Sequence, residues 1–105
     1  MTGGIHYRDD RLTIDGRTAA GLAEGHGTPL YVYSGESMAR AVDRIHAAFP
    51  GGVRICYAVK ANGLRAILRF LAGRGCGFDV VSGGEMLRLE AAGLAGREMV
   101  FDGVG

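Results

Sequence analysis

The sequence has 105 residues, room for one small domain, and its 48% hydrophobic and 22% charged residues are typical of a globular protein. The formal net charge of +1 gives no reason to expect nucleic acid or an anionic membrane as a partner. No apolar run approaches the roughly 20 residues that span a bilayer, and residues 1–8 lack the apolar core of a signal peptide. We therefore expect a cytoplasmic protein.

The cysteines and histidines do not form a metal-binding pattern. Cys56 and Cys76 lack the spacing of a metal pair and are too few for a disulfide framework. His6, His26 and His46 fall in three different predicted elements, so we assign no metal site. The 19 glycines cluster at the junctions between short elements, which indicates many turns rather than low-complexity sequence.

The first part of the chain predicts a hairpin and a short helix. Short alternating runs at 5–8 and 11–15 flank a pair of aspartates, as in a β-hairpin. A helix is predicted over 18–25, with Thr18 as its N-cap and Gly25 at its C-terminal end.

From Thr28 onward, strands alternate with helices. The pattern predicts strands at 30–33, 53–59, 78–81 and 99–102, with helices at 36–49, 62–73 and 82–93 between them. Ser34 is placed to cap the first of these helices. Units of roughly 20 to 25 residues favour parallel strands with right-handed crossovers. We predict an α/β fold in which residues 28–105 form the first half of a (β/α)8 TIM barrel, about four strands and three helices, preceded by residues 1–27.

Lys60 stands out because it ends an otherwise apolar strand. Side chains alternate along a strand, which places Lys60 on the face of Ala58 and Cys56, whose small side chains leave room beside the amine. Desolvation disfavours an ammonium ion, so such a lysine is a candidate Schiff-base nucleophile. The alternative is a lysine whose flexible stem reaches water.

The residues on both sides of this lysine form a specific sequence motif. Tyr57-Ala58-Val59-Lys60-Ala61-Asn62 closely resembles the cofactor-lysine motif of the fold-type III decarboxylases that use pyridoxal 5′-phosphate. Gly77-Phe78-Asp79-Val80-Val81-Ser82-Gly83-Gly84-Glu85 resembles the same family at the family's separation, and the likeness covers nearly the whole chain. The resemblance implies that Lys60 binds this cofactor, which serves as an electron sink at the α-carbon of an amino acid.

The resemblance also suggests a substrate and further site residues. The sequence of Ser82–Glu85 favours the branch of the family that converts meso-diaminopimelate to L-lysine and CO2. Ornithine, arginine and carboxynorspermidine decarboxylases and alanine racemase remain alternatives. Lys60 is the expected catalytic residue, and Ala58, Asp79 and Glu85 join it as expected cofactor-binding residues. Asp79 either pairs with the Lys60 ammonium, as the family implies, or is satisfied by backbone amides. For Glu85, a capping box with Ser82 is favoured over a role in the site.

Other parts of the family's site have no counterpart in these residues. The resemblance implies that the opening hairpin belongs to a β-domain completed by the enzyme's carboxy-terminal part, and that the full-length enzyme is a homodimer. The family's glycine-rich phosphate loop and substrate-carboxylate residues are not found, so we expect the 105-residue chain alone to lack decarboxylase activity. The alternative from another class is a non-catalytic half-barrel that carries cofactor or assembles through its unpaired sheet edges.

Overall fold

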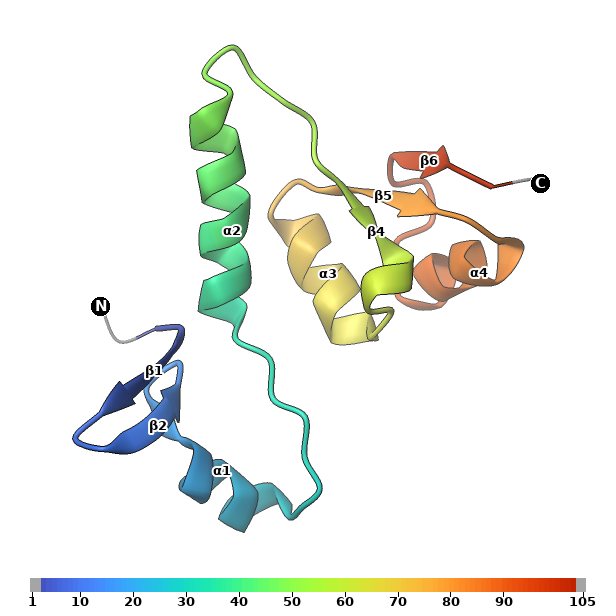
Figure 1. The fold of residues 1–105 in the computed structure, drawn as a ribbon. Helices are drawn as coiled ribbons and strands as arrows, with labels where there is room; N and C mark the ends of the chain where they lie inside the picture. Colours follow the sequence, from blue (N-terminus) through green and yellow to red (C-terminus); the bar gives the residue numbers. More distant parts are fainter. Residues whose placement is uncertain (1–2, 104–105) are drawn as a thin grey trace. The chain divides into compact units, whose positions relative to one another are not determined.

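A computed structural model describes residues 3–103 (Figure 1). In chain order, the elements are β1 (Ile5–Arg8), β2 (Arg11–Ile14), β3 (Arg17–Thr18), α1 (Ala19–His26), α2 (Gly35–Ala48), β4 (Cys56–Ala58), the 3-10 helix η1 (Val59–Ala61), α3 (Arg65–Gly73), β5 (Gly77–Val80), α4 (Gly83–Ala91) and β6 (Met99–Phe101). The predicted α/β character is confirmed. The chain divides into two compact units, one up to Arg44 and one from Ile45. No described helix combines the length and apolar composition that a membrane span requires.

The first unit contains the predicted hairpin and one strand more. Strands β1 and β2 pair antiparallel, and Asp9 and Asp10 between them have φ of 50° and 61°. Two consecutive left-handed residues form the turn that fits the twist of a two-residue hairpin. The short strand β3 then pairs with β2 after a second tight turn at Asp15-Gly16. That residues 1–27 belong to a separate β-domain stays a prediction.

The N-cap of α1 is as predicted, but its C-terminal end is not. Thr18 Oγ1 accepts a hydrogen bond from the Gly21 amide at 3.1 Å. The helix continues past Gly25 to His26 and ends at Gly27, whose φ is 82° and whose amide donates to Ala23 O at 2.7 Å. Ending a helix in this way requires a left-handed residue, which glycine adopts readily, whereas a glycine inside a helix costs only about 1 kcal/mol.

Asp15 joins the hairpin to the start of α2. Its Oδ1 accepts hydrogen bonds from the Gly4 amide at 2.7 Å and from the Ser34 hydroxyl at 2.5 Å. Ser34 Oγ in turn accepts from the Ser37 amide at 3.0 Å, which confirms its predicted capping role. The bond from Ser34 is the main reason that the pKa of Asp15 is lowered; the amides of Gly4 and Glu36 add to it, and desolvation opposes it.

The predicted strand at 30–33 is absent. These residues have no regular structure, and the side chains of Leu30, Tyr31 and Tyr33 are exposed. A run of aliphatic and aromatic residues satisfies the local preference for a strand, but a strand also needs a neighbour to receive its backbone hydrogen bonds. In the described residues, the parallel sheet contains only β4, β5 and β6, in that order. Three parallel strands therefore form instead of four, and closure of a barrel stays a prediction.

The second unit confirms the parallel strands with shifted boundaries. Tyr57 pairs with Phe78, and Phe78 with Met99, in parallel register. Strand β4 covers only Cys56–Ala58 of the predicted 53–59: residues 53–55 have no regular structure, and at the carboxyl end the chain enters η1 at Val59. Helix α3 begins at Arg65 and not near Asn62.

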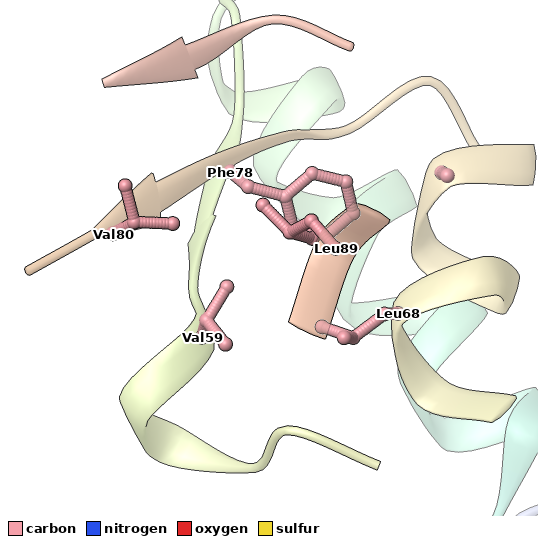
Figure 2. Packing of buried hydrophobic residues seen from close by; sticks show 6 residues of the cluster. Val59, Leu68, Phe78, Val80 and Leu89 are labelled. Atoms are coloured by element: carbon pink, nitrogen blue, oxygen red, sulfur yellow. The ribbon is translucent and has the colours of Figure 1, made fainter. Parts of the chain in front are cut away.

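Both helices of this unit pack on one face of β5. Figure 2 shows the ring of Phe78 on β5 beside Leu89 of α4, with Leu68 of α3 nearby and Val80 further along the strand. The buried cluster comprises Val59, Leu68, Ala72, Phe78, Val80 and Leu89, each at most 9% exposed. Because side chains alternate, Gly77 and Asp79 occupy the opposite face of β5.

Truncating the core should destabilise the second unit. Leu68 is 0% exposed, so Leu68→Ala removes buried methyl groups and is expected to lower the free energy of unfolding by about 2–5 kcal/mol. Leu87 on α4 is 64% exposed, so Leu87→Ala should change it by about 0.5 kcal/mol or less. Urea denaturation followed by circular dichroism measures both; equal effects would contradict the assigned core.

The Asp15 carboxylate should make the stability of the first unit depend on pH. A lowered pKa in the folded state means that the contribution is complete above the ordinary aspartate value of about 3.9 and is lost as pH falls through the folded value. Asp15→Asn should lower the free energy of unfolding at pH 7 by about 1 kcal/mol. The difference from the unsubstituted chain should shrink near pH 2 in urea denaturation, whereas Asp9→Asn in the exposed hairpin turn should have little effect at either pH.

Candidate functional site

Lys60 lies just beyond β4, not at its end as predicted. It is the middle residue of η1, next to Val59, which is 2% exposed and belongs to the core. The Lys60 side chain itself is exposed. The strand alternation that placed Lys60 on the face of Ala58 therefore ends one residue too early. Within the described chain, the lysine reaches water along its stem, which was the alternative interpretation.

A pocket of about 290 Å³ lies beside Lys60. It is lined by residues of η1, of the loop that follows it and of α4: Val59, Lys60, Asn62, Gly63, Leu64, Glu85 and Arg88. The pocket thus brings together two predicted site residues, Lys60 and Glu85. Sequence reasoning missed Asn62 and Arg88. Arg88 could have been found, because it follows Glu85 by three residues and so lies on the same face of the helix.

The loop after Lys60 is held by three hydrogen bonds. The Tyr57 hydroxyl donates to Asn62 O at 3.0 Å, and the Leu64 amide donates to Asn62 Oδ1 at 3.1 Å. Arg88 Nη1 donates to Gly63 O at 3.4 Å. Asn62 acts as the first residue of a local turn rather than as the first residue of α3, which explains the late start of that helix.

Asp79 lies on the face of β5 opposite the core, between Ala58 of β4 and Val100 of β6 in the strand register. Its Oδ1 is buried and has no hydrogen-bond partner among residues 3–103. Neither the Lys60 ammonium nor a backbone amide reaches this oxygen there. A buried carboxylate oxygen without a donor is unfavourable, which marks Asp79 as a residue that requires a further partner. Its role toward a cofactor stays a prediction.

The start of α4 confirms the predicted capping with one difference. Ser82 Oγ accepts a hydrogen bond from the Glu85 amide at 3.2 Å. The Glu85 carboxylate reaches back as in a capping box, but Oε1 accepts from the Val81 amide at 2.9 Å, one residue before the cap. Glu85 therefore fixes the passage from β5 to α4 and also lines the Lys60 pocket. Its cofactor-binding role is untouched by this finding and stays a prediction.

A larger hollow, of about 680 Å³, lies away from Lys60 at the amino ends of the parallel strands. Arg54, Arg97 and Glu98 contribute to its lining, with an ion pair between Arg54 and Glu98. It contains none of the predicted site residues. Sites on parallel sheets form at the carboxyl ends of the strands, so the Lys60 pocket is the candidate. Within the described residues, no three histidine, cysteine, aspartate or glutamate side chains gather to hold a metal ion.

Comparison with known proteins shows the family of this chain. Residues 36–105 match the family model described as pyridoxal-dependent decarboxylase, pyridoxal binding domain. Diaminopimelate decarboxylase of Neisseria meningitidis serogroup B is 48% identical over 85 residues, which are 80% of this chain and 20% of that protein. The enzyme of the same name from Aquifex aeolicus is 42% identical over 96% of this chain and 24% of its own length.

A solved structure shows the same fold over nearly the whole chain. The crystal structure of diaminopimelate decarboxylase from M. jannaschii, in co-complex with L-lysine, superposes with a TM-score of 0.84 at 41% identity, covering 97% of this chain and 25% of that one. The chain thus spans about a quarter or less of the length of these relatives. On the match over residues 36–105, with Lys60 at its pocket, the chain belongs to the pyridoxal-dependent decarboxylases and carries part of their pyridoxal binding domain.

Proposed function

We propose that this chain supplies the cofactor lysine of an enzyme that converts meso-diaminopimelate to L-lysine and CO2. The observation that carries the proposal is the identity of 41–48% to relatives named diaminopimelate decarboxylase, over 77–96% of the chain. One of the solved relatives was crystallised with L-lysine, the product that the proposal requires.

Lys60 is the residue through which the chain would hold the cofactor. It is the only lysine in the 105-residue sequence, and this exposed residue lines the pocket. When bound, pyridoxal 5′-phosphate supplies an electron-withdrawing ring that accepts the electron pair left at the α-carbon of the amino acid. A primary amine beside an accessible pocket is the group that binds an aldehyde, so the residues present fit this end of the cofactor.

Asp79 and Ala58 fit the same assignment. The unpartnered Oδ1 of Asp79 can accept a hydrogen bond from an ammonium or from a ring N–H, and either would remove its unfavourable isolation. Ala58, its register neighbour on β4, has a small side chain that leaves space between Asp79 and the turn that carries Lys60. Glu85 would act on the cofactor site indirectly, because its carboxylate holds the start of α4 beside the pocket.

The rest of the predicted setting belongs to the proposal as well. A cytoplasmic homodimer, a half-barrel over residues 28–105 and a β-domain beginning with residues 1–27 follow from the resemblance to the fold-type III decarboxylases. The regularly paired hairpin of β1 and β2 and the parallel order β4-β5-β6 support this division.

The substrate is tested by measuring CO2 release. The whole enzyme that contains this chain should release labelled CO2 from meso-diaminopimelate and not from ornithine or arginine. Release from ornithine with none from diaminopimelate would assign the chain to a different branch of the family. Racemisation of alanine without CO2 release would exclude decarboxylation altogether.

Chemical trapping tests the role of Lys60. After incubation with pyridoxal 5′-phosphate and reduction with borohydride, peptide mapping should place the label on Lys60. Lys60→Ala should lose this label, and so should Lys60→Arg, because a guanidinium stays protonated and does not condense with the aldehyde. Both variants should keep the circular dichroism of the parent, since the side chain is exposed. An unchanged yield of label in Lys60→Ala would contradict the assignment.

A further inference from the structure

We propose that Arg88 is a positioning residue for Lys60, acting through Gly63 on the loop that follows the lysine. This inference rests on the proposed function, because positioning matters only if the Lys60 amine binds the cofactor. Arg88 lies on α4, and Gly63 lies on the loop between η1 and α3. The contact therefore joins two successive strand–helix segments of the second unit beside the pocket.

Lys60 sits between two fixed points of the backbone. On its amino side, Val59 is anchored in the core against α3 and α4. On its carboxyl side, only Ala61 separates it from Asn62, whose carbonyl accepts the Tyr57 hydroxyl. The direction in which the amine leaves the turn is therefore set by these two points, and a shift of the second would swing the lysine relative to the pocket.

The guanidinium side chain of Arg88 lies directly against Gly63. A Cβ added at Gly63 would lie 3.0 Å from Cδ and 3.3 Å from Nε of Arg88, closer than ordinary van der Waals contact. The φ of Gly63 is not left-handed, so the backbone conformation does not demand glycine there. Close approach of the arginine explains the glycine, and Nη1 of Arg88 also donates to Gly63 O at 3.4 Å.

The backbone of Arg88 is held in place, and its exposed side chain forms no ion pair with any residue among 3–103. Its neighbour Leu89 is 0% exposed, which fixes the backbone of α4 at this point. Glu85, one turn earlier, directs Oε1 to the Val81 amide, and no ion pair joins it to Arg88 in the described part of the chain. The guanidinium thus reaches across the pocket to the Gly63 carbonyl rather than pairing along its own helix.

Proteolysis of the peptide bond after Lys60 tests whether the contact between Arg88 and Gly63 holds the turn in place. Because Lys60 is the only lysine, a lysine-specific endoproteinase cleaves this sequence only after Lys60, and it does so when the turn opens. Arg88→Gln should raise the cleavage rate about 3- to 10-fold, as expected for the loss of one hydrogen bond and its packing. Arg69→Gln, on the exposed side of α3, should leave the rate unchanged. Equal rates for Arg88→Gln and the parent chain would overturn the proposal.

Binding of the cofactor provides a second readout, which a purely structural role would not move. The absorbance of the pyridoxal 5′-phosphate adduct should show a dissociation constant raised about 3- to 10-fold by Arg88→Gln and, to a similar extent, by Gly63→Ala, which displaces the arginine. The double variant should be no weaker than either single one, because both remove the same contact. Additive losses would overturn the coupling between Arg88 and Gly63.

The two measurements separate this inference from the proposed function. If the whole enzyme that contains this chain forms no adduct at Lys60, the proposed function fails, whereas the cleavage rates still decide whether Arg88 holds the turn in place. If the adduct forms with equal affinity in the parent and in Arg88→Gln, the proposed function stands and the positioning role is refuted.

Discussion

The packing of Phe78 and Val80 against α3 and α4 is the constraint on which the second unit depends. Both side chains are fully buried, and they fix which face of β5 meets the helices. Because side chains alternate along a strand, Asp79, which lies between these two residues, occupies the face of β5 away from the core. The same cluster takes in Val59 and so determines where the chain leaves β4. The position of Lys60 follows from the burial of its neighbour Val59.

Local signals were predictable from the sequence, and signals that need a distant partner were not. The capping roles of Thr18, Ser34 and Ser82 are confirmed because a cap depends on residues three positions away. The predicted strand at 30–33 was wrong because a run of strand-forming residues does not show whether a neighbouring strand exists. The 53–59 strand was too long at both ends: residues 53–55 have no regular structure, and at the carboxyl end the backbone turns into η1 at Val59, which is buried in the core cluster.

In the candidate site too, local sequence patterns were predictable and contacts between distant residues were not. Lys60 was identified from its motif, and Glu85 from its spacing to Ser82, since both patterns are written in consecutive residues. Arg88 and Gly63 are 25 residues apart, and only the fold brings them into contact. A glycine with ordinary φ gives no conformational signal in a sequence, so its reason becomes visible only when the arginine beside it is seen.

Two features of the site point to the same chemistry for different reasons. The Lys60 amine is accessible but held within a turn, as a nucleophile must be if an aldehyde is to approach it in a fixed direction. Oδ1 of Asp79 is buried and has no hydrogen-bond donor among residues 3–103, which is unfavourable for a carboxylate oxygen. A group that binds the amine and also presents a hydrogen-bond donor toward β5 would satisfy both residues at once. The pyridoxal binding domain to which the residues belong is built for such a group.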